Sequence, residues 1–153
     1  MNLAAHITIR PIQPQEQDEA RALILSGLEE RWGLIDPTKN PDLIDLMAAY
    51  DQGVFLVALL DGTIVGTGAL LPEGETTGRI VRMSVKKTLR SQGLGTTILD
   101  ELIRAARALG MDRIVLETTA TWLDAVAFYE KRGFCSLGVR EGDHHFEMDI
   151  REA

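Results

Sequence analysis

The stretch RIVRMSVKKTLRSQGLGTTILDELIRAARAL, residues 79–109, decides the fold. It opens with a short apolar segment, 80–85, whose β-branched residues favour a strand over a buried helix. A basic turn with two glycines follows at 90–95. From residue 94 to residue 106, apolar side chains recur at spacings of three and four with charged residues between them, which predicts an amphipathic helix. The stretch therefore predicts a strand, a glycine-rich turn and a helix, in that order.

The turn at 90–95 has the features of a phosphate site. Gly93 and Gly95 lack the Cβ atoms that would keep an anion away from the backbone, and the first helical turn has unpaired N–H groups at the positive end of the helix dipole. Two common nucleotide motifs do not match, because Ile98 stands where GxGxxG requires its third glycine and GxxxxGK[ST] is absent. We expect a phosphorylated ligand here, although a loop that merely turns the chain remains the alternative.

The rest of the chain reads as further alternating elements. Asp61-Gly62 predicts a tight hairpin, and Gly66 and Gly68 predict a bulge or a close approach of another backbone or a ligand. A right-handed crossover should make strands 80–85 and 113–118 parallel neighbours. The expected fold class is α/β with the order β-α-α-β-β-β-α-β-α-β-β: a single mixed, mostly antiparallel sheet with a central parallel strand pair and helices on both faces. The predicted strands are 6–10, 54–60, 63–71, 80–85, 113–118, 134–139 and 145–150, and the predicted helices are 14–32, 40–53, 94–109 and 122–131.

Composition limits the class of protein. With 153 residues, 45% of them hydrophobic, residues 1–153 are expected to form a single domain. The net charge of −7, from 16 basic and 23 acidic residues, argues against a nucleic-acid partner. No apolar run reaches the ~20 residues of a membrane span, so no membrane partner and a cytoplasmic location are expected.

Other chemistries have little support in the sequence. The single cysteine, Cys135, cannot form an intrachain disulfide and is expected to be a small buried hydrophobe. His144 and His145 are adjacent on an alternating strand and should point to opposite faces, so no metal site is expected.

Two motifs carry a resemblance to a known family. Arg90-x-x-Gly93-x-Gly95 matches the signature Q/R-x-x-G-x-G/A, and the run from Ala125 through Tyr129-Glu130-Lys131 to Phe134 resembles A-x-x-x-Y-E-K-x-G-F. With the element order, these motifs resemble the GCN5-related N-acetyltransferase (GNAT) family and its acyl-CoA N-acyltransferase fold. The resemblance implies acetyl-CoA as cosubstrate and transfer of its acetyl group to a primary amine by direct attack in a ternary complex.

The resemblance also implies which residues hold the cosubstrate. The pantetheine arm would pair with Met83, Ser84 and Val85 as an added strand, and the backbone N–H of Met83 would stabilise the developing oxyanion. The pyrophosphate would lie on Arg90, Ser91, Gln92, Gly93, Leu94, Gly95 and Thr96. Trp122 departs from the family pattern, because many members have there an Asn that contacts the cofactor.

Two residues are candidates for proton transfer. Tyr129 matches the family's usual donor to the departing thiolate, and the alternative is an ordinary core tyrosine. Glu117, near the carboxyl end of a parallel strand, could take the proton of the amine. It could equally be a surface carboxylate paired with Arg113. Members often carry a carboxylate where this chain has Arg79 and Ile80, so an ordered water chain is a third possibility for the base.

The acceptor in this fold would lie between the first two helices and the last hairpin. There, Trp32, Leu34, Ile35 and Asp36 would form an apolar floor with an anionic spot, suited to a small-molecule or amino-acid-like amine. Simple packing of helix against loop would explain Trp32 as well. The alternatives are acetylation of a protein lysine or N-terminus, and a non-catalytic acyl-CoA-binding module. A homodimer through the last strands is possible.

Overall fold

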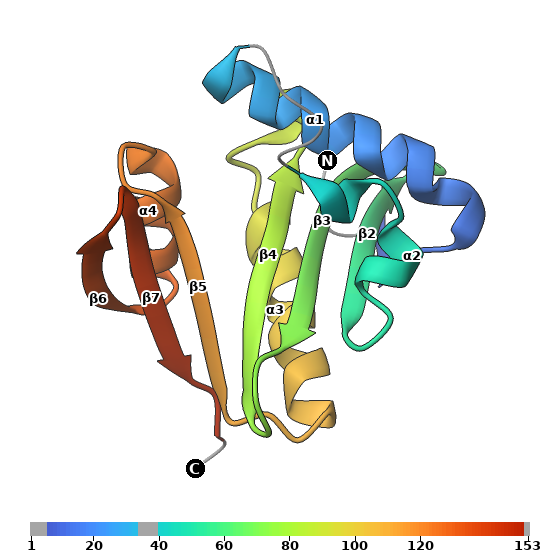
Figure 1. The fold of residues 1–153 in the computed structure, drawn as a ribbon. Helices are drawn as coiled ribbons and strands as arrows, with labels where there is room; N and C mark the ends of the chain where they lie inside the picture. The colour runs from blue at the N-terminus through green and yellow to red at the C-terminus, as the bar shows by residue number, and fades with distance from the viewer. Residues whose placement is uncertain (1–5, 34–39, 152–153) are drawn as a thin grey trace.

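The computed structural model describes residues 6–33 and 40–151. Its strands form one seven-stranded sheet in the order β1-β2-β3-β4-β5-β7-β6 (Figure 1). The strands are β1 (Ile7–Pro11), β2 (Val54–Leu60), β3 (Thr63–Pro72), β4 (Thr77–Val85), β5 (Arg113–Thr119), β6 (Cys135–Arg140) and β7 (Asp143–Asp149). The helices are α1 (Gln17–Trp32), α2 (Leu46–Ala49), α3 (Leu94–Ala108) and α4 (Leu123–Lys131), and short 3-10 turns lie at Pro14–Glu16, Pro41–Leu43 and Lys87–Leu89.

The predicted fold class is confirmed. Strands β4 and β5 are parallel and all other neighbours are antiparallel. Helices α1 and α2 lie on the face turned towards the viewer in Figure 1, here called the front face, while α3 and α4 lie on the back face. The Asp61-Gly62 hairpin is also confirmed, since both residues have the positive φ angles, 51° and 81°, that a tight primed turn requires.

The parallel pair separates part of the way along. Strand β4 pairs with β5 only from Thr77↔Arg113 to Arg79↔Val115. Beyond these residues β4 pairs with β3 alone and β5 with β7 alone, and the two strands diverge towards their carboxyl ends (Figure 1). We call this region the β4/β5 opening. It leaves one edge of 80–85 without a strand partner in the described chain, ready to accept an added strand.

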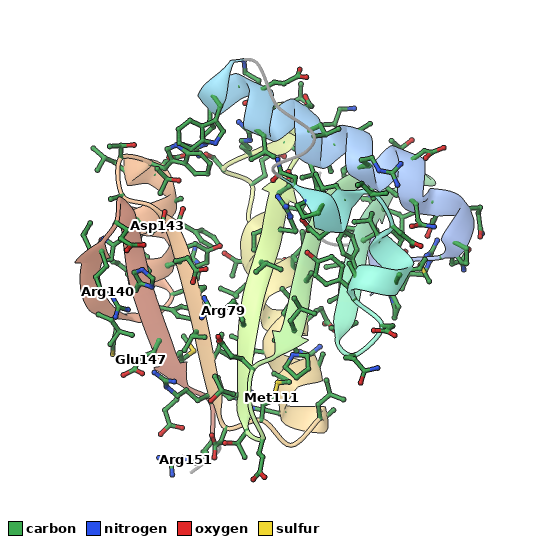
Figure 2. The ribbon with its side chains drawn as sticks, viewed as in Figure 1. Arg79, Met111, Arg140, Asp143, Glu147 and Arg151 are labelled. Carbon is green, nitrogen blue, oxygen red and sulfur yellow. The ribbon has the colours of Figure 1, made fainter. Side chains whose placement is uncertain are left out.

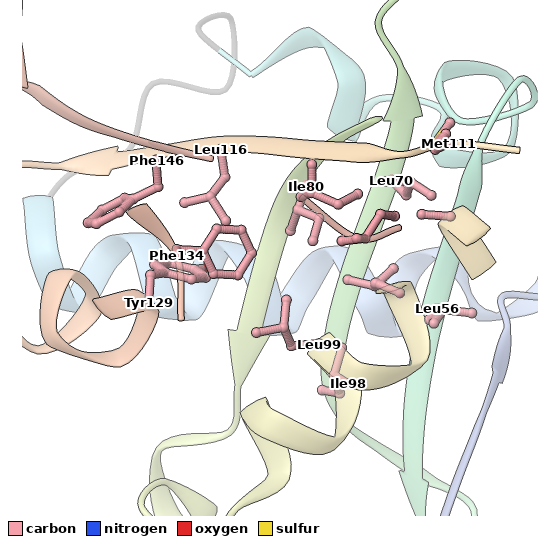
Figure 3. Packing of buried hydrophobic residues seen from close by; sticks show 14 of the residues in the cluster. Leu56, Leu70, Ile80, Ile98, Leu99, Met111, Leu116, Tyr129, Phe134 and Phe146 are labelled. Atoms are coloured by element: carbon pink, nitrogen blue, oxygen red, sulfur yellow. The ribbon is translucent and has the colours of Figure 1, made fainter. Parts of the chain in front are cut away.

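Two hydrophobic clusters hold the layers together. The back cluster packs α3 and α4 against the sheet, and Figure 3 shows its centre. The front cluster lies under α1 and α2. The largest fully buried side chains are those of Phe146, Leu46, Leu70, Ile98, Leu99, Leu102, Ile114, Leu116 and Ile150. Most of them belong to the back cluster, so α3 rests on a rigid support. This helix begins in the turn at 90–95, which we call the phosphate turn.

The glycines of β3 allow α3 to approach the sheet closely. A Cβ atom at Gly66 would stand 2.7 Å from Ile98 Cδ1, and one at Gly68 would stand 2.7 Å from Ile98 Cγ2 and 2.8 Å from Met83 Sδ. Of the two predicted alternatives the bulge is confirmed, because the pairing of β3 shifts next to Gly66 on the β2 side and at Gly68 on the β4 side. The atoms nearest to both glycines are side-chain atoms of Ile98. These two positions fix how near the helix of the phosphate turn comes to the sheet.

Two sequence predictions are wrong in detail. The continuous helix predicted at 40–53 is instead a 3-10 turn followed by the short α2, because Asp45 begins a new helix by accepting a hydrogen bond from the Ala48 N–H at 3.1 Å. Asn40 stands at the N-cap of the 3-10 turn, but its side chain makes no capping hydrogen bond. Cys135 is exposed rather than buried, because it begins the edge strand β6, all of whose residues are exposed.

Candidate active site

The phosphate turn has the conformation that its glycines predict. Gly93 is the N-cap of α3 with φ = 87°, a left-handed value that suits glycine, and no side chain caps this helix within the described residues. The N–H groups of the first turn therefore stay open to a ligand. The Leu94 side chain is buried in the back cluster, so Leu94 can offer only its backbone.

Arg90 is held at the mouth of this turn. Its Nε donates to the Val85 carbonyl at 3.1 Å, and its guanidinium donates to both Glu30 carboxylate oxygens at 2.7 and 3.2 Å. The hydrogen bond from Arg90 lowers the pKa of Glu30 from its ordinary value. Nearby, Thr96 Oγ1 accepts a hydrogen bond from Arg132 Nε at 2.7 Å. An incoming pyrophosphate would compete with Glu30 for Arg90.

The last turn of α1 contacts both sides of the β4/β5 opening. Glu30 reaches Arg90 after β4, while the guanidinium of Arg31 donates to Asp124 of α4 at 2.7 and 2.9 Å. Arg31 also lies over the Trp122 ring at 4.4 Å, and the Trp32 and Trp122 rings are 5.4 Å apart. Trp122 thus packs on α1. At the position of Trp122, many family members are expected to have an Asn. Trp32 remains 57% exposed.

A bulge in β4 places Arg82 in an unusual conformation directly before Met83. Arg82 has φ = 55°, which few non-glycine residues adopt, and the β3/β4 register shifts between Thr67 and Ala69. The fully buried Thr67 donates from Oγ1 to the Arg82 carbonyl at 2.8 Å. The bulge therefore sets the direction of the backbone that leads to Met83.

The Arg82 side chain ties the bulge to the loop before α2. Its guanidinium donates to Asp42 at 2.6 and 2.8 Å and to Asn40 at 3.1 Å. Tyr50 donates to Asp42 at 2.7 Å. Burial alone would raise the pKa of Asp42, but the hydrogen bonds from Arg82 and Tyr50 outweigh burial and hold that pKa below its ordinary value. The carboxylate stays charged and keeps the loop on the sheet.

Tyr129 of α4 packs in the back cluster. Its ring lies 5.1 Å from Phe128, 5.7 Å from Phe134 and 6.0 Å from Phe146, centroid to centroid (Figure 3). Its hydroxyl has no hydrogen-bond partner among the described residues. In the same residues, every side-chain oxygen that is fully enclosed does have a hydrogen-bond partner. The hydroxyl oxygen is therefore not completely enclosed, although the Tyr129 side chain is buried. Burial raises the pKa of Tyr129, so its proton is retained.

A cavity lies on the front face beside the β4/β5 opening, over β4, β5, β7 and β6, where no described helix covers the sheet (Figure 1). Its volume is about 260 Å³. We call it the front groove. The charged and histidine side chains that line it are those of Glu73, Arg79, Arg113, Glu117, Arg140 and His145.

Ion pairs in the front groove differ from those that the sequence suggested. Glu117 pairs with Arg79 instead of Arg113, and Arg79 also binds Glu73 at 2.9 Å. Arg113 donates from Nε to Glu147 at 2.8 Å. The reason is the parallel register, which places Arg79 level with Val115, between the two carboxylates. Arg79 stands where the family often has its carboxylate.

The two candidate catalytic residues lie on opposite faces of the sheet. Leu116 shares the back cluster with Tyr129, and the next residue, Glu117, points into the front groove. Between them, pairing of β4 with β5 ends at Arg79↔Val115, where the β4/β5 opening begins. Leu34, Ile35 and Asp36, predicted to form the acceptor floor, lie outside the described residues.

The histidines separate as predicted. The His144 ring stacks on Phe146 at 4.3 Å and its Nε2 lies 2.7 Å from Ser136 Oγ, while His145 lines the front groove. No group of three or more His, Cys, Asp or Glu residues in the described part of the chain is placed to hold a metal ion.

Sequence reasoning missed several residues of this site. Glu30, Arg82, Arg140 and His145 reach it only through contacts between segments distant in the chain. The one sequence signal for the bulge at Arg82 is Gly68, the glycine opposite it on β3.

Comparison with known proteins supports this description. The Acetyltransferase (GNAT) family model matches residues 18–134. The chain is 31% identical over 135 residues to the IAA acetyltransferase of Azospirillum brasilense, covering 87% of each chain. It is 34% identical over 110 residues to the human N-acetylaspartate synthetase, covering 69% of this chain and 36% of that protein. The PaiA N-acetyltransferase of Thermoplasma acidophilum, solved in complex with coenzyme A, superposes with a TM-score of 0.81 at 16% identity, covering 94% of this chain and 98% of that one.

The fold and the site thus define an acyl-CoA acyltransferase. The chain belongs to the GNAT acetyltransferase family and is an acetyl-CoA-dependent N-acetyltransferase. The residues present fit the cosubstrate, because an unpaired strand edge ends in an uncapped, glycine-opened helix N-terminus. None of the helices within residues 6–33 and 40–151 is long and apolar enough to cross a membrane.

Proposed function

We propose that the chain transfers the acetyl group to the primary amine of a small-molecule or amino-acid-like acceptor, by direct attack in a ternary complex. The observation that carries this proposal is the β4/β5 opening, which begins beside the front groove and leaves the edge of β4 that leads to the phosphate turn without a strand partner in the described chain. A cosubstrate and an acceptor can each reach it, one from each side of the sheet.

The cosubstrate would be held mainly by backbone groups. The unpaired edge at Met83, Ser84 and Val85 is suited to the amides of the pantetheine arm, and the N–H groups from Ser91 to Thr96 are suited to the pyrophosphate. Arg90 would exchange Glu30 for a phosphate oxygen. Acetyl-CoA supplies the activated acyl group and a thiolate leaving group.

The proposed chemistry needs three contributions from the chain. A carboxylate of the front groove, Glu117, takes a proton from the ammonium form of the acceptor, directly or through water, so that the neutral nitrogen can attack the thioester carbon. The nitrogen releases a second proton to water as the amide forms. The Met83 N–H, oriented by the bulge at Arg82, donates to the carbonyl oxygen as charge develops there. As the C–S bond breaks, Tyr129 donates its proton to the sulfur and regains one from solvent. The products are the N-acetylated amine and the free thiol.

Two alternatives receive less support. A protein lysine or N-terminus needs an open acceptor surface, whereas the last turn of α1 contacts both sides of the opening. A non-catalytic acyl-CoA-binding module has no use for a buried phenol whose hydroxyl is left without a partner in the described chain.

We also propose the domain organisation, the cellular location and the oligomeric state of the chain. The single sheet supports one domain for the chain, and the free thiol of Cys135 suits the reducing cytoplasm. The exposed Leu137 and Val139 of the edge strand β6 would suit a homodimer contact.

The proposal is tested with purified protein, acetyl-CoA and a panel of primary amines, with release of free thiol as the readout. We expect acceptor-dependent thiol release above a slow hydrolysis, and binding of both acetyl-CoA and coenzyme A by calorimetry. Absence of binding together with absence of turnover would refute the proposal.

A further inference from the structure

One arginine of the front groove has no oppositely charged partner among the described residues. Arg140 of β6 lines the groove, and it has no hydrogen bond or ion pair to any described residue. The other two arginines of the groove are already paired with carboxylates. A guanidinium is always charged and presents a planar fork of donors, which suits a carboxylate ligand. Arg140 is therefore the position where the groove can bind an anionic group.

The opposite end of the groove suits an amine. Glu117 lies on β5 beside the β4/β5 opening, and its side chain is 34% exposed. Arg79, its partner, also binds Glu73, so Arg79 remains paired when Glu117 turns towards a ligand. An amine at Glu117 would stand next to the opening through which the acyl group is presented.

The distance between the two ends limits the ligand to a small one. Glu117 is level with His145 on β7, which is level with Gly138 on β6, and Arg140 lies two residues further along β6, so the backbones at the two ends are about 12 Å apart. Figure 2 shows Arg79 and Arg140 on opposite sides of β7. Two hydrogen bonds of about 2.8 Å each leave room for only a few carbon atoms between amine and carboxylate. The cavity volume, about 260 Å³, lies just under the ~300–1,000 Å³ of usual small-molecule sites.

We infer that the acceptor is a zwitterion, an amino acid or a close analogue, whose carboxylate binds Arg140 and whose amine is directed to Glu117. This inference rests on the proposed function and names its substrate class. The net charge of −7 does not oppose it, because a zwitterion carries no net charge to be repelled. A plain cationic amine would instead leave Arg140 facing a like charge.

The first experiment compares each common L-amino acid with its own carboxamide, by initial rates of thiol release from acetyl-CoA. Neutralising the carboxylate makes the amine easier to deprotonate, so a preference for the acid cannot come from intrinsic reactivity. We expect at least one amino acid to be acetylated with a kcat/KM about tenfold or more above that of its carboxamide.

The second experiment uses Arg140→Gln, with Arg104→Gln as the matched control. Arg104 lies on α3, pairs with Glu101 and does not line the groove. We expect Arg140→Gln to raise KM for the preferred amino acid about 10–100-fold, the value of one charge-assisted hydrogen bond, with kcat little changed. The carboxamide should be unaffected, and Arg104→Gln should behave as wild type with both substrates.

Three results would overturn the inference: carboxamides accepted as well as acids, an Arg140→Gln effect equal for both, or no amino acid accepted at all. Acetylation of amines that lack a carboxylate would leave the proposed function intact while excluding this substrate class. The proposed function itself would be refuted by a different result, namely no binding of the coenzyme together with no turnover of any amine.

Discussion

At the scale of single residues, the site depends on polar groups whose partners are incomplete or exchangeable. Arg90 shares its guanidinium with Glu30, Arg79 lies between two carboxylates, and the Tyr129 hydroxyl has no described partner. Most polar groups inside proteins are fully paired, so groups left open at one place mark a region prepared for ligands. Arg79 belongs to the last β4/β5 pair and Arg90 contacts the end of β4, so both flank the β4/β5 opening.

Replacing Tyr129 by Phe tests whether its hydroxyl serves chemistry or packing. Because the raised pKa keeps the phenol protonated, its loss should remove the donor to the leaving thiolate and lower kcat about 100-fold. The ring contacts remain and no partner is left unpaired, so the free energy of unfolding should change by less than about 1 kcal/mol. Steady-state kinetics, calorimetry with coenzyme A and urea denaturation provide the readouts.

For this variant, coenzyme affinity is the internal control and should equal that of wild type. Unchanged kcat would assign Tyr129 to the hydrophobic core alone.

At the scale of elements, the position of α3 determines where the phosphate turn stands. The helix rests on β3 at Gly66 and Gly68, and its own Ile98 fills the space that side chains there would occupy. The short distance between helix and strand brings the first turn of α3 close to the end of β4, where a Cβ atom at Gly95 would stand 3.9 Å from Val85 Cγ2. The two glycines of β3 thus set the position of the phosphate turn without contacting it.

Gly68→Ala should destabilise the fold because its Cβ atom would lie within 2.9 Å of Ile98, Met83 and Leu102 atoms. Overpacking of this kind costs about 1–3 kcal/mol, read as a lower midpoint in urea denaturation followed by circular dichroism. Gly27→Ala in α1 is the control. Its Cβ would stand 3.4 Å from Ser84 Oγ, and alanine favours a helix, so stability should be kept or slightly raised. Equal midpoints for the two variants would contradict this account of the packing.

At the scale of the whole molecule, a polar contact joins the layers that the hydrophobic clusters form. Arg82 on the central strand binds Asp42 in the loop before α2, and Tyr50 supports the same carboxylate. This contact connects the front layer, on the acceptor side, to the bulge beside Met83. The acceptor side and the oxyanion donor therefore keep a fixed relation to each other.

Stability should fall in acid partly through this contact. The folded-state pKa of Asp42 is lowered, so its contribution to stability is fully present above the unfolded value of about 3.9 and is lost as pH falls through the folded value. At pH 7 the variant Asp42→Asn should be less stable by about 1–3 kcal/mol, because a half-buried guanidinium loses its partner. The difference between the two proteins should begin to shrink below about pH 4 and should vanish only below the lowered folded pKa of Asp42, as measured by urea denaturation across pH.

The control for the acid series is Asp18→Asn, which removes a fully exposed carboxylate of α1 paired with Arg21. Its pH dependence should follow wild type. A constant difference between wild type and Asp42→Asn at every pH would rule out the proposed linkage.

The sequence by itself determined the elements and the family. Strand alternation, the helical stripe after Gly95 and the Asp61-Gly62 turn are local patterns, and local patterns act through periodicity and turn geometry that neighbouring residues define. The two motifs around Gly93 and Tyr129 identified the cosubstrate for the same reason, since backbone approach to a phosphate is decided within a few residues.

Only the tertiary structure decided the partners of the charged residues. Glu117 pairs with Arg79 rather than Arg113 because the register between β4 and β5 sets which side chains face each other, and register is a long-range property. The strain at Arg82 and the open guanidinium of Arg140 likewise arise where segments distant in the chain meet. Spacing along the chain carries no information about such contacts, which depend on how the sheet is assembled.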